Sequence, residues 1–526
     1  MRPNLMDKNL LRLFLLVFAL VFLLTSCSQE NEQLSPQITI TFEDEIAAPQ
    51  ATTPFYTPTS VVTNTPSPTP EPVSPLGIVP DDLKDIDIQF WHTWSGEAGE
   101  AVDEIVEAFN SQNQWGIQVQ AAYMGDPDEN FTNIQVAIEK GEPPNIGMGA
   151  LYQALDWNSA WELADINIFI DDPLWGLNAE EVDDFYPAFW EHDYSQGNRI
   201  GIPAQRSGQV MYYNQTWGEE LGFTSAPTTP REFKRQACVA ARYNQNDDDQ
   251  ENDGSGGLII STNYSVVLGW MYAFGAHVVA SNDGNQSSLE NNPYDFDNPQ
   301  VEDGFTFLRD LYDDGCAWIS DYPYPDVDFA ARRALFATDA VTGIPYQQAA
   351  MLQSGNSDRW AVIPFPSPAQ AGGISVYGPS FVIFSATPEE DLASWVFIKW
   401  LISPQNQASL IEASGAFPLR ASVLELEQEN AVLSPQWFDA SQALTSARPE
   451  PPFQSWNLVR WAVSDAATQL FRYYFTIDQI PDLIVYLHET ANDLHNDPLH
   501  DSSVKTSTPT PLVETPAENV TVTPAP

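Results

Sequence analysis

The sequence predicts an α/β protein with two lobes that are joined by a hinge. A strand-loop-helix order occurs twice between residues 83 and 149, strands and helices return over residues 230–376, and a polar turn at residues 205–207 lies between two apolar stretches. The chain has 526 residues, of which 43% are hydrophobic, including 16 Trp and 28 Phe. This length and composition suffice for more than one hydrophobic core.

The first lobe begins at about residue 83. Residues 86–90 alternate between apolar and polar side chains, which is the period of a half-buried strand. Residues 102–109 carry apolar side chains one helical turn apart and predict an amphipathic helix. A second strand at residues 117–123 and a second helix that ends at Gly141 repeat the order. Ligands of such sheets gather at the loops beyond the strand ends.

The polar turn at residues 205–207 follows a short strand and precedes an apolar run at residues 210–213, which predicts a second, buried strand. Its side chains are Gln205, Arg206 and Ser207. They are compatible with a hinge lined by hydrogen-bonding groups and equally with an ordinary loop between two strands.

The second lobe is expected over residues 230–376. A helix start at Asn298-Pro299 precedes an apolar helix face, and residues 340–345 and 360–364 predict its last strands. Further on, Thr387 followed by Pro and two Glu predicts another helix start. That helix is apolar nearly all round, so we expect it in a core.

Both ends of the chain predict segments outside the folded body. Residues 13–24 form an unbroken apolar run, which fits the core of a signal peptide over residues 1–26. Residues 24–27 resemble the lipobox of bacterial lipoproteins, so we expect Cys27 to be lipidated and to anchor the protein to the cell membrane at its extracytoplasmic face. Residues 27–82 and 501–526 are rich in Thr and Pro and predict an extended linker and a disordered tail.

Charge and cysteine content exclude several kinds of partner. The formal net charge of −51 disfavours nucleic acid and other polyanions as ligands, although an acidic secreted protein without any charged partner explains most of it. No cysteine or histidine spacing predicts a metal site.

Residues 246–254 resemble the first half of a calcium loop, but Ile260 stands at the position of the bidentate Glu, so we expect a solvated loop. Cys238 and Cys316 are expected to form a disulfide in an oxidising compartment.

Several motifs follow one another between about residues 84 and 495. They are Phe90-Trp-His-Thr-Trp-Ser-Gly, Pro143-Pro-Asn-Ile, Gly201-Ile-Pro through Tyr212-Tyr-Asn, Gly378-Pro-Ser-Phe-Val-Ile, and Phe397-Ile-Lys-Trp-Leu with Ser403-Pro-Gln-Asn-Gln-Ala. In this order they resemble the family 1 extracellular solute-binding proteins, the sugar-binding receptors of ABC importers. Asn145 departs from the Asp that is usual in that family, in a turn whose role is mainly structural.

The resemblance implies a type II periplasmic-binding-protein-like fold, in which two lobes close on a ligand. The implied first-lobe segments are 83–207 and 380–448, and the implied second-lobe segments are 208–379 and 449–500. The implied crossovers lie at residues 205–209, 377–381 and about 447–452.

A sugar has apolar ring faces and polar edges, so its binding site needs flat aromatic rings and fixed hydrogen-bonding groups. The resemblance also implies which residues of this chain supply them. These residues are Trp94, Ser95, Gln205, Arg206, Ser207, Trp270, Tyr346, Tyr377, Gly378, Arg420 and Trp456. Core positions for Trp270 and Trp456, and a surface ion pair for Arg420, are the alternatives. We expect Trp94 to stack on one side of the ligand and Tyr346 or Trp456 on the other.

We therefore expect a monomeric lipoprotein that captures a neutral extracellular carbohydrate and delivers it to the permease subunits of an ABC transporter, without a cofactor. A receptor for another small solute, such as a polyol phosphate, is one alternative. A secreted carbohydrate-active hydrolase is the other, since it would also carry aromatic residues and carboxylates. We expect no enzymatic activity, because no Gly-x-Ser-x-Gly motif appears and a hinge serves capture rather than turnover.

Overall fold

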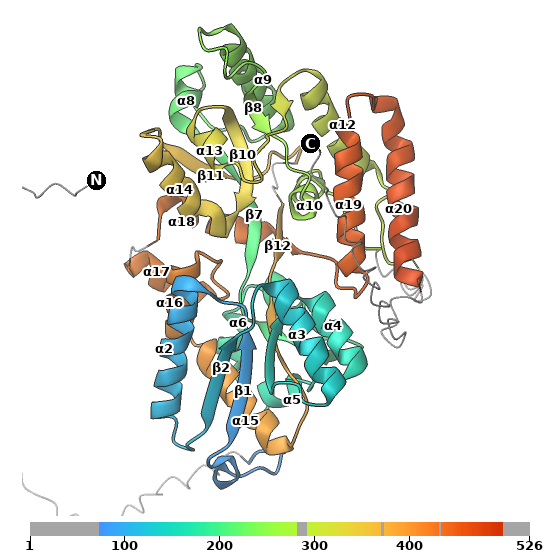
Figure 1. Ribbon diagram of the computed structural model, residues 1–526. Helices are drawn as coiled ribbons and strands as arrows, with labels where there is room; N and C mark the ends of the chain where they lie inside the picture. Colours follow the sequence, from blue (N-terminus) through green and yellow to red (C-terminus); the bar gives the residue numbers. More distant parts are fainter. Residues whose placement is uncertain (1–72, 281–291, 370–372, 431–432, 498–526) are drawn as a thin grey trace, which may run out of the picture. The chain divides into compact units, whose positions relative to one another are not determined.

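The computed structural model describes residues 73–280, 292–369, 373–430 and 433–497 (Figure 1). Within these residues, two β-sheets packed with helices form two α/β lobes, as the sequence predicts. The predicted signal peptide, the predicted lipidation site at Cys27 and the predicted tail lie outside the described residues, as does most of the predicted linker.

The first lobe is built on a five-stranded sheet in the order β2-β1-β3-β13-β6. Its strands are β1 (Asp87–His92), β2 (Gln118–Tyr123), β3 (Ile146–Gly149), β6 (Ile202–Pro203) and β13 (Ser380–Ile383). β1 pairs in parallel with β2 and β3, whereas β13 runs antiparallel to β3 and β6. The two strands predicted at residues 86–90 and 117–123 are confirmed. Ile88 and Phe90 are fully buried on one face of β1, which is why the alternating pattern identified this strand.

Helices surround this sheet. They are α2 (Gly96–Gln112), α3 (Pro127–Lys140), α4 (Leu151–Ala160), α15 (Pro388–Leu401), α16 (Pro404–Ser414) and α17 (Ala421–Asn430), with the short η1 (Pro80–Leu83), α5 (Asn167–Ile170), α6 (Ala179–Asp183) and α7 (Pro187–Trp190), and a ribbon of β4 (Tyr194–Ser195) and β5 (Asn198–Arg199). α2 packs on β2, α15 on β1 and α3 on β3. The helix predicted after Thr387 is α15, where the Thr387 side chain accepts a hydrogen bond from the Glu390 backbone.

The second lobe is built on a seven-stranded sheet. Its strands are β7 (Ser207–Asn214), β8 (Gly256–Ile259), β9 (Ala317–Trp318), β10 (Ala334–Ala340), β11 (Trp360–Ile363), β12 (Ile374–Tyr377) and β14 (Ala447–Pro449). Their order is β14-β12-β7-β10-β8-β9, and β11 also pairs with β7. All eight residues of β7 are buried, which explains the unbroken apolar run in the sequence.

The helices of the second lobe are α8 (Gln215–Glu220), α9 (Pro230–Asn246), α10 (Tyr264–Ala273), α12 (Pro299–Asp313), α13 (Asp326–Ala330), α14 (Ile344–Gln353), α18 (Pro435–Gln442), α19 (Trp456–Leu470) and α20 (Ile480–Asn496), with η2 (Val341–Gly343), η3 (Ala443–Ser446) and η4 (Ile477–Gln479). α10 packs on β12 and α19, and nine of its ten residues are buried. Figure 1 shows α19 and α20 side by side at one edge of this lobe, and the two helices are in contact.

A disulfide joins Cys238 and Cys316, which is the pairing that the sequence predicts. Cys238 lies in α9 and Cys316 directly precedes β9, and their Cα atoms are 4.4 Å apart. The bond therefore ties a helix of the second lobe to the edge of its sheet.

The chain passes between the lobes at residues 204–206 and again at residues 378–379, close to two of the expected crossovers. The expected third crossover near residues 447–452 is wrong. α18 already packs on β11, and β14 pairs with β12, so both belong with the second sheet. The chain has therefore reached the second lobe where α18 begins at Pro435. A short helix such as α18 does not reveal from its own apolar pattern which of two sheets it packs on.

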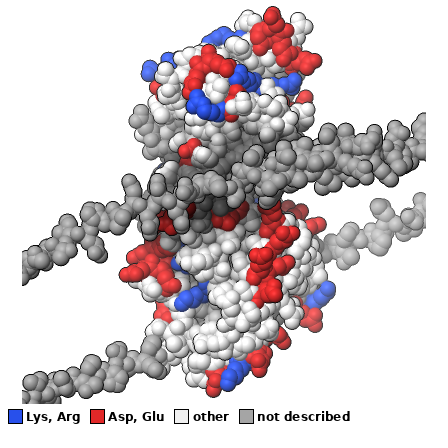
Figure 2. All heavy atoms as spheres, turned by 90° about the vertical axis from the view of Figure 1, so that its left-hand side faces the viewer, with Lys and Arg blue, Asp and Glu red and all other residues white. Residues whose placement is uncertain are grey.

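No helix among the described residues has the length and apolar character needed to cross a lipid bilayer. On the face shown in Figure 2, acidic side chains (red) outnumber basic ones (blue), in line with the net charge of −51 for the whole sequence.

Candidate ligand-binding site

A cavity of about 520 Å³ lies where loops from both lobes meet. The first lobe contributes the start of α3 and the turn from β3 into α4, and the second lobe contributes α10, the end of β14 and the start of α19. The two crossovers at residues 204–206 and 378–379 border the same space. A cavity at such a junction is the usual position for a small-molecule site.

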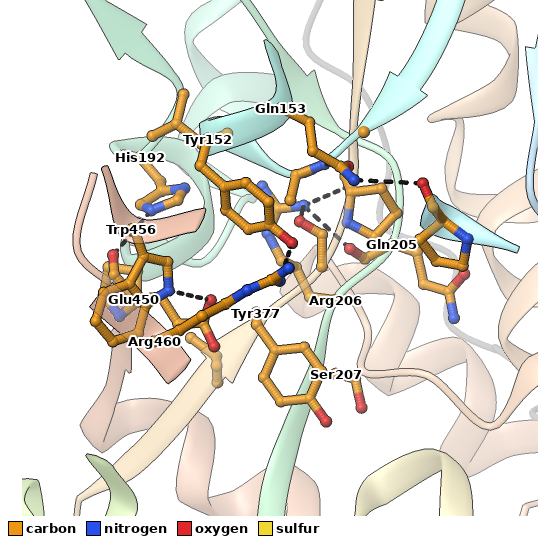
Figure 3. Close-up of a pocket in the computed structure, with 18 of the residues that line it drawn as sticks. Tyr152, Gln153, His192, Gln205, Arg206, Ser207, Tyr377, Glu450, Trp456 and Arg460 are labelled. Atoms are coloured by element: carbon orange, nitrogen blue, oxygen red, sulfur yellow. Dashed lines mark hydrogen bonds between the residues drawn. The ribbon is translucent and has the colours of Figure 1, made fainter. Parts of the chain in front are cut away.

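The first-lobe wall is shaped by helix starts. The Asp126 side chain caps α3 by accepting hydrogen bonds from the backbone N–H groups of Asp128 and Glu129, 2.9 Å each. Gln153 holds the start of α4, because its Oε1 accepts from Ala150 N at 2.9 Å. These bonds fix the backbone that presents Tyr152, the residue before Gln153, to the cavity (Figure 3).

The second-lobe wall contains a buried acid and a buried indole. Glu450 accepts hydrogen bonds from the Ser265 hydroxyl at 2.7 Å and from the Trp456 indole nitrogen at 2.8 Å. Burial raises the pKa of Glu450, and the hydrogen bonds from Ser265 and Trp456 only partly offset that effect. Trp456 is fully buried in the core of the second lobe, although its atoms also border the cavity.

Arg460 connects the two walls. Its guanidinium lies 4.5 Å from the centre of the Tyr152 ring, 5.6 Å from that of Tyr264 and 5.2 Å from that of Trp461. One of its nitrogens, Nη1, donates to the Tyr152 hydroxyl, and the side chain also bonds Asn457 through Nε and Nη2 at 3.2 Å each. Because Tyr152 belongs to the first lobe and Arg460 to the second, this contact spans the cavity (Figure 3).

Arg206 holds the two crossovers together and is not a free ligand-binding group. We call this group of contacts, from Arg206 to Asp193, Pro379 and Ser380, the clamp. It is buried, and its Nη2 forms an ion pair with Asp193 at 3.0 Å and donates to the Ser380 hydroxyl at 2.8 Å. Its Nη1 donates to the Pro379 carbonyl at 2.6 Å. Burial by itself raises the pKa of Asp193, but the Arg206 charge and the hydrogen bonds from His192 and Ser380 lower it to well below its usual range.

His192 extends this clamp toward the second lobe. Its Nδ1 lies 3.3 Å from Asp193 Oδ1, and its Nε2 lies 3.2 Å from the backbone oxygen of Glu450. The network therefore joins both crossovers to the end of β14.

The remaining crossover residues line the floor of the cavity. The Tyr377 hydroxyl accepts a hydrogen bond from Gln209 at 2.9 Å, and burial raises its pKa. Gly378 has φ +147°, and a Cβ there would lie 2.3 Å from the Gln205 carbonyl oxygen. Glycine is therefore required at this position.

The structure brings together only some of the residues that the sequence singles out. Gln205, Arg206, Ser207, Tyr377, Gly378 and Trp456 border the cavity. Trp94 lies behind it, packed edge-on against Phe90 and Phe381, and its indole donates to Gln205 Oε1 at 2.5 Å. Ser95 is the exposed residue before α2. The expectation that Trp94 stacks on a ligand is therefore corrected, since its ring is buried in the first lobe.

Three other expected residues do not reach the cavity. Trp270 is buried against Phe233 and Phe365 in the core of the second lobe. Tyr346 is 70% exposed on α14 and is not one of the residues that line the cavity. Arg420 is buried in the first lobe over the Phe185 ring, at 4.0 Å from its centre, and 3.9 Å from Asp184. Packing inside the lobes decided the positions of Trp270 and Arg420, and a motif places a residue only to within a turn.

Six further residues line the cavity although the sequence did not single them out: Tyr152, His192, Tyr264, Glu450, Arg460 and Trp461. Arg460 carried a usable signal, because it is four residues after Trp456 and therefore shares its helix face. Glu450 stands between prolines, and nothing in its local sequence sets it apart from the other acids of the chain.

Comparisons with known proteins agree with this fold. A family model described as "Bacterial extracellular solute-binding protein" matches residues 104–442. The sn-glycerol-3-phosphate-binding periplasmic protein UgpB of Salmonella typhimurium is 23% identical over 364 residues, which cover 65% of this chain and 76% of that protein.

Solved structures show the same two-lobed fold at low identity. The cyclic alpha-maltosyl-1,6-maltose binding protein of Arthrobacter globiformis has a TM-score of 0.65 and 17% identity, and the match covers 78% of this chain and all of that one. UgpB of Mycobacterium tuberculosis, in complex with glycerophosphocholine, has a TM-score of 0.60 and 16% identity over 77% of this chain and 98% of that one. Since the family model spans more than half of the sequence, the chain belongs to the bacterial extracellular solute-binding protein family.

Proposed function

We propose that the protein captures a neutral carbohydrate in the cavity between its lobes, at the extracytoplasmic face of the cell membrane, and delivers it to the permease subunits of an ABC importer. The observation that carries the proposal is the lining of the cavity. Tyr152, Tyr264, Tyr377 and Trp461 supply aromatic rings or hydroxyl groups, and Gln205 and Ser207 supply further polar groups. This combination suits the apolar ring faces and polar edges of sugars.

A phosphorylated polyol is the second candidate, because the curated relatives are named as sn-glycerol-3-phosphate-binding proteins. The charges that line the cavity argue against it for this chain. Among the described lining residues there is no lysine, and of the two arginines Arg206 is engaged by Asp193. Three acids, Asp126, Asp128 and Glu450, border the same space. This distribution disfavours a dianionic ligand.

Membrane attachment through Cys27 belongs to the proposal as well. Acylation would keep the mature protein at the membrane while its lobes remain in solution, since each buried methylene contributes about 0.8 kcal/mol. Replacing Cys27 with Ala should release the protein from the membrane fraction. Unchanged partitioning of a variant with unchanged mass would contradict this part of the proposal.

The ligand class is tested by thermal-shift measurements with neutral mono-, di- and trisaccharides beside glycerol 3-phosphate and glycerophosphocholine. A compound present at 100 times its dissociation constant should add about 2.7 kcal/mol of stability. Tyr152→Phe, which removes a hydroxyl from the cavity, should reduce the shift, whereas Tyr486→Phe on exposed α20 should not. A shift with phosphate esters alone would favour the second candidate. Recovery of a cleaved sugar after incubation would favour the hydrolase alternative.

A further inference from the structure

Glu450 has an unusual position for a carboxyl group. It lies in the cavity wall just after β14, is only 8% exposed, and among the described residues forms no ion pair with a basic side chain. Its side chain accepts hydrogen bonds from the Ser265 hydroxyl and from the Trp456 indole, and Figure 3 shows the bond to Trp456. Each carboxylate oxygen therefore uses one of its two lone pairs.

The two remaining lone pairs make Glu450 an acceptor for a ligand. We infer that Glu450 is a specificity-determining residue of the proposed carbohydrate site, which selects ligands that donate hydroxyl hydrogen bonds and rejects ligands that carry a phosphate. The inference rests on the proposed function and adds the residue that discriminates between its two candidate ligand classes.

The chemistry of the two ligand classes gives the reason. A sugar hydroxyl can donate to a carboxylate, and such charge-assisted bonds are about twice as strong as neutral ones. A phosphate monoester at neutral pH offers only acceptors and negative charge to the same oxygens. Close like charges in a site shielded from water repel each other strongly. The hydrogen bonds that Ser265 and Trp456 donate favour the ionised carboxylate and lower its pKa against the effect of burial.

Arg460 does not reverse this preference. Its guanidinium nitrogens bond the Tyr152 hydroxyl and Asn457, and the side chain is held among aromatic rings. These bonds use three of its five N–H groups, and a phosphate that paired with the other two would bring negative charge into the cavity that Glu450 also lines. Glu450 would have to accommodate the added charge as well.

Glu450→Gln tests the inference, because the amide has the same shape. Its oxygen can accept from Trp456 and its nitrogen can donate to the Ser265 hydroxyl, so the fold should be retained. Glu427→Gln is the matched control, since Glu427 is a buried acid of α17 that does not line the cavity. Affinities are measured by titration calorimetry with glucose, maltose, maltotriose, cellobiose, trehalose, glycerol 3-phosphate and glucose 6-phosphate.

The expected result for Glu450→Gln is at least about tenfold weaker binding of the sugar that binds the wild-type protein best, as expected for the loss of one charged hydrogen bond. The variant should also bind the phosphate esters at least about fivefold more tightly than the wild-type protein does. Glu427→Gln should change neither affinity.

Other outcomes separate the inference from the proposed function. If the wild-type protein binds a sugar and Glu450→Gln binds it equally well, or gains nothing toward phosphate esters, the inference is overturned and the proposed function stands. If the wild-type protein binds a phosphate ester and no sugar, or binds none of the probes, both are overturned.

Discussion

Replacing Asp193 with Asn should destabilise the protein strongly, because it leaves Arg206 without its ion-pair partner. Both side chains are almost completely buried, and the N–O distance between them is 3.0 Å. Removing one member of a buried ion pair typically costs about 3–5 kcal/mol, since the other charge stays buried and unpaired. The asparagine also presents an amide N–H₂ group to donors such as Arg206, Ser380 and His192.

The loss is measured by urea unfolding at neutral pH, as a lower midpoint with an unchanged slope. A matched control is Glu219→Gln, which breaks the exposed ion pair with Arg359 at 2.7 Å and should cost at most about 1 kcal/mol. The double variant Asp193→Leu with Arg206→Met removes both charges and should be more stable than Asp193→Asn alone.

The pH dependence follows from the lowered pKa of Asp193. A carboxyl whose folded-state pKa lies below its unfolded value of about 3.9 stabilises the fold above that value, and the contribution is lost as the pH falls through the folded-state pKa. The difference between wild type and Asp193→Asn should therefore be constant at neutral pH and shrink only in strong acid. Two results would refute the role of the Asp193–Arg206 ion pair. One is a loss of less than about 1 kcal/mol for Asp193→Asn. The other is a double variant whose loss of stability equals the sum of the losses for Asp193→Leu and Arg206→Met alone.

Three further predictions concern the second lobe and α17. Reducing the Cys238–Cys316 bond, whose ends are 78 residues apart, should lower the free energy of unfolding by about 4–5 kcal/mol in the chain-entropy description, and equal urea midpoints with and without reductant would contradict this. Trp456 is fully buried, so Trp456→Ala should cost about 3–5 kcal/mol of stability. Trp461 lines the same cavity but is 53% exposed, so Trp461→Ala should weaken ligand binding with little change in melting temperature. The reverse pattern would contradict the placement of the two side chains. Burial raises the pKa of Glu427 to about 7, above its unfolded value of about 4.3. The folded state therefore binds an extra proton between these two values, and the free energy of unfolding should fall as the pH rises through that range. Glu427→Gln should reduce the difference in stability between pH 5 and pH 8 in urea unfolding, and an unchanged difference would contradict the assignment.

Local patterns determined the elements of this fold. Alternation in β1, the continuous apolar run of β7 and the cap at Thr387 each depend on side chains close together in the sequence, so each element could be predicted without the structure. The two-lobed arrangement followed from the order of these elements and from the family resemblance. The disulfide was predictable because the only two cysteines outside the lipobox leave one pairing.

The cavity is formed by contacts between residues that are far apart in the sequence. Arg206 meets Ser380 and Glu450 meets Ser265, at separations of 174 and 185 residues, so no local pattern records either contact. Arg206 looked like a ligand-binding residue because of its place at a crossover, and only the fold showed that Asp193 engages it. Trp94 and Trp270 have the side chains that a sugar site needs, but packing buried both of them in lobe cores. A sequence determines which side chains are available, and tertiary packing determines which of them remain unpaired at a surface that a ligand can reach.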